Sequence, residues 1–174
     1  GGNIGLSTIG FRELGFTKNK IIMFEPDRFL LANYVSKVTK NYPNVKVYPF
    51  GLSNRSEKKK LFRAFYKNVF FHFNNSFNLT YLKEKLVHNY GIKAKKFKIK
   101  STTFNLKKFD ELNITDKICF LKIDVEGFDE YVLYGMKKFL KKNDPTILVE
   151  YNECNFSKIY KFLKNRYNCY FYKD

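Results

Sequence analysis

The chain has 174 residues, 44% of them hydrophobic and 19% aromatic, which allows one domain with a core and excludes an intrinsically disordered polymer. No apolar run reaches the about 18 residues that indicate a membrane-spanning helix. Lys and Arg number 33 against 16 Asp and Glu, a formal net charge of +17 that favours a polyanionic partner such as nucleic acid. The lysines are scattered along the chain, however, and this pattern is also typical of solvated faces and compositional drift.

Three cysteines, Cys119, Cys154 and Cys169, lie far apart and show no metal-ligand spacing. They predict neither a disulfide framework nor a zinc site, and they indicate a reducing compartment, which would be the cytoplasm.

Apolar runs of strand length alternate with helical patterns along most of the chain. The N-terminal part predicts a strand at 19–26 closed by Glu25 and Pro26, a helix at 27–42 capped by Asp27, and a strand at 45–50. The C-terminal part predicts a strand at 118–125, a helix at 130–142, a strand at 145–153, a helix at 155–167 and a last strand at 168–174. This alternation is typical of an α/β fold whose mostly parallel sheet carries helices on both faces.

Residues 54–113 break the alternation. They predict a short strand at 59–66, an aromatic loop at 68–77, a helix at 79–90 and a short strand at 96–104. We interpret them as an insertion that lies over the sheet, within a single domain spanning 1–174. The aromatic run of Phe70, Phe71, His72 and Phe73 is expected to pack against the sheet, and stacking on a sugar ring is the alternative.

The chain begins with "GGNIG", directly before a helical pattern. A glycine segment that leads into a helix N-terminus binds anionic groups, although a flexible tail has the same composition. Glu25 ends the next strand about 20 residues further on, where an acidic residue typically binds the ribose of a nucleoside cofactor. Gly51 and Ser53 follow the strand after that and would lie beside the adenine ring.

The stretch "LKIDVEGFDE" places four acidic residues at the end of a predicted strand. In an open parallel sheet, ligands bind beyond the carboxyl ends of the strands, and alternation puts Asp124 and Glu126 on the same side. Asp129 and Glu130 fit the acidic first turn of the following helix. Asp124 and Glu126 are therefore the functional candidates in this stretch.

Five segments taken in order, "GGNIG", "MFEPDRF", "FGLSN", "LKIDVEGFDEYVLYGMKKFL" and "PTILVEYNE", resemble the FkbM family of S-adenosylmethionine-dependent methyltransferases. The resemblance covers nearly the whole chain. It implies a Rossmann-like class I methyltransferase fold, S-adenosylmethionine as cofactor, and O-methylation of a hydroxyl group on a sugar, a glycan or a small natural product. It also implies the following site: Gly2, Asn3 and Gly5 in the cofactor loop, Glu25 and Pro26 at the ribose, Gly51 and Ser53 near adenine, and Asp124 and Glu126 near the transferred methyl.

In such a fold the glycine segment follows a first strand at the centre of the sheet, and the sequence has nothing before Gly1. We therefore expect a fragment of a longer protein, truncated at both ends. Its sheet either leaves the edges beside the missing strand unpaired or closes up across the gap.

A hydroxyl acceptor needs a base within hydrogen-bond reach, and we rank Asp124 first, Glu126 second and Glu150 third for this role. The same carboxylates suit Mg²⁺, which is an alternative use for them. Two rival functions stay open: a nucleic-acid methyltransferase, which the +17 charge favours, and a cofactor-binding protein without turnover.

Overall fold

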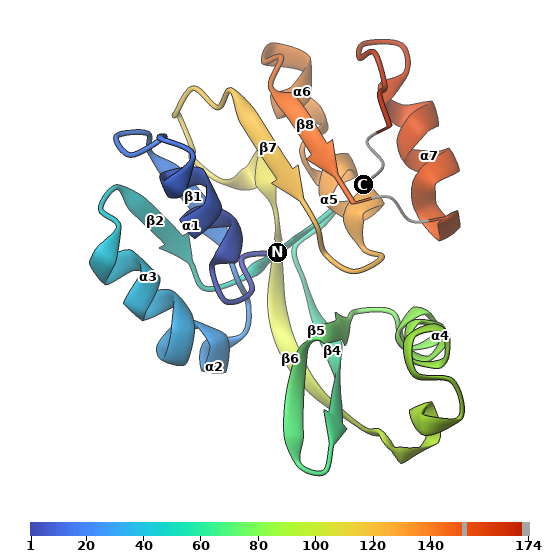
Figure 1. Cartoon of the computed structure of the whole chain (residues 1–174). Coiled ribbons are helices and arrows are strands. Elements are labelled where there is room, and N and C mark those ends of the chain that lie inside the picture. Colours follow the sequence, from blue (N-terminus) through green and yellow to red (C-terminus); the bar gives the residue numbers. More distant parts are fainter. Residues whose placement is uncertain (151–152, 172–174) are drawn as a thin grey trace.

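The computed structural model describes residues 1–150 and 153–171, which form a mixed α/β structure (Figure 1). Its N-terminal elements are α1 (Leu6–Glu13), β1 (Ile21–Phe24), α2 (Arg28–Leu30), a π-helical turn (Leu31–Val35), α3 (Ser36–Asn41), β2 (Val45–Tyr48) and β3 (Gly51–Ser53). The middle of the chain forms β4 (Glu57–Tyr66), β5 (Val69–Ser76), α4 (Leu79–Tyr90), β6 (Lys98–Lys108) and two 3₁₀ turns (Gly91–Lys96 and Phe109–Glu111). The C-terminal elements are β7 (Phe120–Ile123), α5 (Asp129–Gly135), α6 (Lys137–Lys142), β8 (Thr146–Val149) and α7 (Glu153–Leu163).

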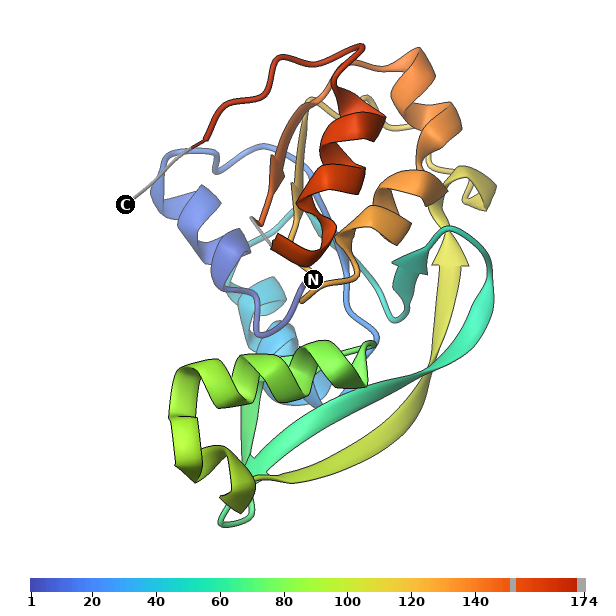
Figure 2. The ribbon, with the colours of Figure 1, turned by 90° about the vertical axis from the view of Figure 1, so that its right-hand side faces the viewer.

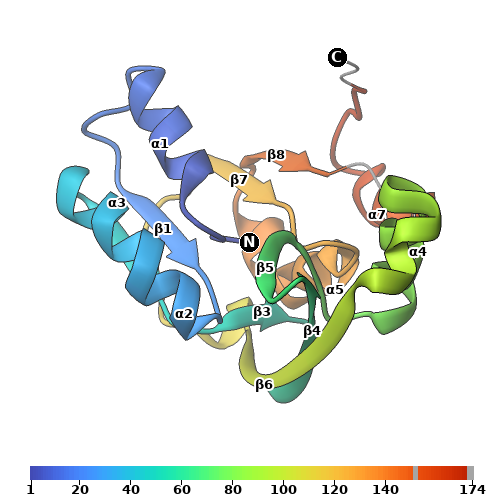
Figure 3. The same cartoon turned by 60° about the horizontal axis from the view of Figure 1, so that its bottom comes forward.

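The predicted parallel strands form two separate pairs, β1 with β2 and β7 with β8. The first residues of the chain lie between the carboxyl ends of the two pairs (Figure 3). The amide of Gly2 donates to the carbonyl of Phe24 at 3.0 Å, and a Cβ on Gly1 would collide with the main-chain oxygen of Asp124. The strands are parallel as predicted, but β1 and β7 do not pair, so the sheet does not close up across the gap.

The insertion supplies most of a four-stranded sheet of order β3-β6-β4-β5, in which β3 and β6 are parallel and the other pairs antiparallel. The prediction of an aromatic loop at 68–77 is wrong, because β5 occupies most of it. Lys67 and Asn68 both have positive φ, 46° and 65°, and link the paired residues Tyr66 and Val69 as a two-residue type I′ turn. This turn lacks the glycine that usually marks it in a sequence, so the hairpin was missed.

The insertion has a small apolar cluster of its own. Leu82 and Leu86 of α4 pack against Ala64 of β4, and each of the three is almost fully buried. Figure 2 shows α4 lying alongside the long β4 and β6 ribbons. The insertion therefore lies at the carboxyl ends of the parallel strands, rather than over a face of the sheet as expected.

The predicted helices form, but one of them divides into two. Asp27 caps its helix as predicted, because its carboxylate accepts from the amide of Phe29 at 2.9 Å. The helix predicted at 130–142 divides into α5 and α6 at Met136. The last predicted strand is wrong for residues 168–171, which pair with no described strand; residues 151–152 and 172–174 lie outside the described part of the chain.

The main core lies between β7 and the helices that follow it. Its buried members are Phe109, Ile123, Val132, Leu133, Met136, Leu140, Ile159 and Leu163. Five of them lie in the helices: Val132 and Leu133 in α5, Leu140 in α6, and Ile159 and Leu163 in α7, so each helix contributes apolar side chains to the cluster that contains Ile123 of β7. The packing fixes where β7 ends, and with it the position of the acidic residues that follow.

Candidate functional site

The glycine segment crosses the end of β1 and turns into α1. Gly5 has a φ of 87° and lies against the side chain of Val38, so a side chain at this position would be both strained and crowded. The amide of Gly5 donates to the carbonyl of Gly2 at 2.9 Å. The segment is therefore a defined turn, and the alternative of a flexible tail is not what the structure shows.

Glu25 joins this turn to the end of β1. Its two carboxylate oxygens accept from the amides of Asn3 at 2.6 Å and Asp27 at 2.8 Å, and the residue is 5% exposed. Burial raises the pKa of this carboxyl and the charge of Asp27 adds to the rise, while the amides of Asp27 and Asn3 and the N-terminal ammonium group oppose it. The structure places Glu25 beside the glycine segment, as the sequence predicts, and its contact with a ribose stays a prediction.

Gly51 and Ser53 lie in β3 and are buried. The hydroxyl of Ser53 lies 3.3 Å from side-chain oxygens of Asn54 and Glu57, and Gly51 is close to Leu106 and Pro26. Neither residue lines the cavity described below, and their contact with adenine stays a prediction.

The acidic residues after β7 lie on a sharply turned loop. Glu126 and Gly127 have positive φ, 53° and 81°, so the chain already turns at Glu126. Buried Asp129 accepts from the amide of Val125 at 2.9 Å, and the hydroxyl of Ser76 donates to the carbonyl of Glu126 at 2.7 Å. A non-glycine residue in this conformation is unfavourable, and these bonds on both sides hold it in place.

The glycine segment, the acidic loop and the insertion enclose a cavity of about 420 Å³, which we call the carboxylate cavity. All three candidate bases, Asp124, Glu126 and Glu150, line it. Gly2 and Asn3 line it from the glycine segment. The structure thus brings together residues from both ends of the chain that the sequence analysis singled out separately.

The three carboxylates of this cavity differ in their partners. Lys122 forms an ion pair with Asp124, and Lys85 forms one with Glu126. Glu150 has no ion pair within the described part of the chain, and burial together with the charges of Asp124 and Glu126 raises its pKa to about 7. Burial also raises the pKa of Glu126, against the opposing effect of Lys85.

Sequence reasoning missed the wall of the cavity that the insertion provides. Asn74 of β5 and Lys85, Asn89 and Tyr90 of α4 line it. Lys85 and Asn89 are four residues apart and so share one polar face of α4, but this pattern does not reveal which surface the face meets. Phe70 packs on Phe29 and Phe65, and Phe71 packs on Tyr90 and Phe97. Neither Phe70 nor Phe71 lines the cavity, so these two rings do not support the alternative of stacking on a sugar there.

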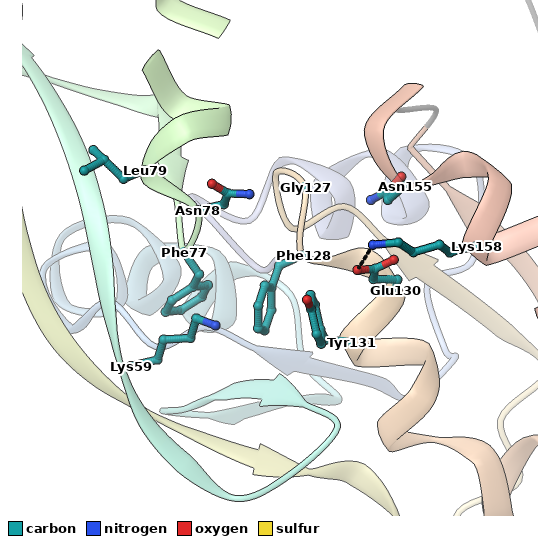
Figure 4. A pocket seen from close by; sticks show the side chains of 10 residues that line it. All are labelled: Lys59, Phe77, Asn78, Leu79, Gly127, Phe128, Glu130, Tyr131, Asn155 and Lys158. Carbon is teal, nitrogen blue, oxygen red and sulfur yellow. Dashed lines mark hydrogen bonds and ion pairs between the residues drawn. The ribbon is translucent and has the colours of Figure 1, made fainter. Parts of the chain in front are cut away.

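A second cavity of about 290 Å³, the rear cavity, lies on the other side of the acidic loop, where Gly127 and Phe128 line it (Figure 4). The ring of Phe128 stacks on Tyr131, with centroids 4.4 Å apart, and the ammonium of Lys59 lies 4.4 Å from the Phe128 centroid. Lys158 pairs with buried Glu130 at 3.0 Å. These contacts pack against the acidic loop and the start of α5 on the side of the rear cavity.

Neither a metal centre nor a membrane span emerges from the described residues. Among them, no group of three or more His, Cys, Asp or Glu side chains is arranged to hold a metal ion. No helix in residues 1–150 and 153–171 is long and apolar enough to cross a membrane.

Comparison with known proteins finds one matching family model and one solved structure with a similar fold. A family model described as the methyltransferase FkbM domain matches residues 1–169. The chain is similar to the crystal structure of methyltransferase FkbM from Methylobacillus flagellatus, with 17% sequence identity and a TM-score of 0.55. The match covers 86% of this chain and 30% of that one, so the chain spans less than a third of the relative, and at this identity the likeness shows the fold alone. No curated protein matches the chain.

Proposed function

Because this chain belongs to the FkbM methyltransferase family, we propose that it transfers a methyl group from S-adenosylmethionine to a hydroxyl group of a sugar, a glycan or a natural product. The observation that carries the proposal is the meeting of the glycine segment and three carboxylates in one cavity. As part of the same proposal, the pairs β1–β2 and β7–β8 are two halves of one Rossmann-like arrangement with the cofactor at their carboxyl ends.

The carboxylate cavity fits such a cofactor in two respects. The side-chain oxygen of Asn3 is buried and has no hydrogen-bond partner within the described part of the chain, so a ligand donor would satisfy it. Three carboxylates against two lysines also leave the side chains of the lining with a net negative charge, which suits a cationic sulfonium. When bound, the cofactor supplies an electrophilic methyl carbon, and the protein positions the acceptor and manages its proton.

Within this proposal Glu150 takes the proton of the acceptor hydroxyl. A base works best when its pKa is near the operating pH, and the pKa of Glu150 is raised to about 7. Asp124 and Glu126 each form an ion pair with a lysine, which leaves their carboxylates engaged and suited to orient the acceptor and face the cofactor. This assignment places Glu150 ahead of Asp124, the reverse of the order that the sequence suggested.

Two measurements on the same protein test the function. Isothermal titration with S-adenosylmethionine tests cofactor binding, and transfer of a radiolabelled methyl group to a panel of hydroxyl compounds tests turnover. Binding with transfer supports the proposal. Binding without transfer to any acceptor indicates a cofactor-binding protein without turnover, transfer to RNA alone indicates a nucleic-acid methyltransferase, and the absence of binding refutes the proposed function.

A further inference from the structure

The insertion and the glycine segment contribute different parts of the lining of the carboxylate cavity. Asn74 comes from the edge strand β5, and Tyr90 is the last residue of α4. The glycine segment and the ends of the parallel strands form the side where a nucleoside cofactor would bind. The insertion wall is therefore the side left for the acceptor.

The side chain of Asn74, which belongs to this wall, is only partly hydrogen-bonded within the described part of the chain. The residue is 4% exposed, and its side-chain amide donates to the hydroxyl of Tyr90 at 3.4 Å. Its side-chain oxygen has no hydrogen-bond partner within residues 1–150 and 153–171. Buried amide oxygens are nearly always satisfied, so an unsatisfied one in a side chain at the edge of a cavity points to a ligand that donates a hydrogen bond.

The charges of the cavity restrict what that ligand is. Both lysines of the lining, Lys85 and Lys122, already pair with carboxylates of the same cavity. A phosphate or carboxylate ligand would therefore find no unpaired lysine among the lining residues and would lie beside the carboxyl of Glu150. Neutral hydroxyl groups, in contrast, both donate to carboxylate and amide oxygens and accept from the amide and phenol groups of Asn74, Asn89 and Tyr90.

We propose that Asn74 and Tyr90 bind the acceptor and select a neutral, polyhydroxylated molecule, excluding phosphorylated sugars, uronic acids and nucleic acids. This inference rests on the proposed methyl transfer and adds the class of acceptor and the residues that recognise it. Asn74 and Tyr90 set the affinity for the acceptor, whereas Glu150 acts on its proton.

The chain contains a matched control for this assignment. Asn75 is the next residue of β5, also has a side-chain oxygen without a partner in the described part of the chain, and does not line the carboxylate cavity. Its side-chain amide donates to the carbonyl of His72 at 2.9 Å. The variants Asn74→Leu and Asn75→Leu therefore make the same chemical change on neighbouring residues, and Tyr90→Phe removes only the hydroxyl group.

The test measures labelled methyl transfer by the whole protein to four probes: methyl glycosides of neutral hexoses, hexose 6-phosphates, uronic acids and a single-stranded RNA. We expect transfer to the neutral glycosides. Asn74→Leu and Tyr90→Phe should raise their KM about tenfold, as for one lost hydrogen bond, with a small effect on kcat. Binding of S-adenosylmethionine, measured by titration, should change less than about twofold, since it lies on the other wall.

Several outcomes would overturn the inference while leaving the methyltransferase proposal intact. They are a preference for the hexose 6-phosphates or the uronic acids, an unchanged KM in both variants, or an equal rise in Asn75→Leu. No transfer to any probe by a protein that binds S-adenosylmethionine, or transfer to the RNA alone, would overturn the inference together with the proposed hydroxyl methylation. If Asn74→Leu does not fold, Tyr90→Phe alone decides between these outcomes. Failure of wild-type protein to bind S-adenosylmethionine would instead remove the proposed function itself.

Discussion

Glu150 differs from the other two carboxylates of the carboxylate cavity in what surrounds it. Lys122 and Lys85 form ion pairs with Asp124 and Glu126, while Glu150 has no ion pair within the described part of the chain. Residue 150 keeps exposed surface, yet desolvation of its carboxyl is the largest cause of its raised pKa, followed by the negative charges of Asp124 and Glu126. At the scale of single residues, the structure therefore distinguishes three acids that the sequence ranks in the opposite order.

The first prediction concerns the role of Glu150 as base. Glu150→Gln should lower kcat about 100-fold or more, the usual contribution of a general base. In wild-type protein, kcat/KM should rise with pH up to about 7 and then level off, because the base must be deprotonated. A profile that stays flat between pH 5.5 and 8.5, about 1.5 pH units on either side of this pKa, would contradict the assignment. A larger loss of kcat in Asp124→Asn than in Glu150→Gln would also contradict it.

Stability provides an independent check on the same residue. The pKa of Glu150 is raised from 4.5 to about 7 in the folded protein, so the unfolded chain releases this proton first as the pH rises. Between pH 4.5 and about 7, Glu150 is ionised mainly in the unfolded chain, so the free energy of unfolding falls as the pH rises through this range. Because Glu150→Gln lacks this effect, its melting temperature relative to wild type should increase across that range.

The break between α5 and α6 shows how tertiary contacts reshape a helix whose pattern is continuous in the sequence. Gly135 lies directly on the main chain of β3, where a Cβ would collide with the carbonyl oxygen of Ser53. Close packing of the helix end on this strand accompanies the change of direction at Met136, which has a φ of −105°. Glycine is needed here for close approach rather than for its backbone conformation.

The second prediction compares two helical glycines. Gly135→Ala should lower the free energy of unfolding by about 2–3 kcal/mol, because the strand backbone has no room for the added methyl. Gly10→Ala, in α1, meets no atom within 4 Å and should instead raise it by about 0.5–1 kcal/mol through helix propensity. Urea denaturation of both variants measures these changes, and equal effects would show that the contact with Ser53 is unimportant.

The third prediction concerns the turn between β4 and β5. Type I′ turns favour Asn followed by Gly, whereas this turn has Lys67 and Asn68 in left-handed conformations. The double variant Lys67→Asn with Asn68→Gly should raise the free energy of unfolding by about 1 kcal/mol. Asn68→Val should lower it, and a thermal melt in which both variants match wild type would mean that the turn is not formed in solution.

At the scale of the whole molecule, one buried ion pair ties the insertion to the rest of the chain. The Nη2 atom of Arg63 in β4 lies 2.8 Å from the Oδ2 atom of Asp27, the residue that caps α2. The side chain of Asp27 is 1% exposed. The guanidinium also lies 5.1 Å from the ring centroid of Phe104 and 5.7 Å from that of Phe70. Because α4 projects from the same insertion into the carboxylate cavity, this anchor helps to position its wall.

The fourth prediction tests that anchor. Arg63→Met leaves the carboxylate of Asp27 buried without its cation and should lower the free energy of unfolding by about 3 kcal/mol. Adding Asp27→Asn should recover part of this loss, because the neutral amide needs no counter-charge and still accepts from the amide of Phe29. Denaturant unfolding of the single and double variants measures the coupling, and the absence of any recovery would argue against it.

The sequence by itself determined the features that depend on neighbouring residues. The cap at Asp27, the strands β1, β2, β7 and β8, the helix α4, and the acids after β7 all follow from periodicity, capping and turn chemistry. The motifs from "GGNIG" to "PTILVEYNE" were also sufficient to identify the family, because its family model follows the order of residues rather than their contacts.

Only the tertiary structure decided how these parts meet. Lys85 and Glu126 are 41 positions apart, and no local pattern encodes that α4 faces the acidic loop. The same holds for the burial of Asn74, for the raised pKa of Glu150 and for the separation of the two parallel pairs. The physical reason is that pKa values and unmet hydrogen bonds arise from what surrounds a group in space, whereas the sequence specifies directly only what precedes and follows it along the chain.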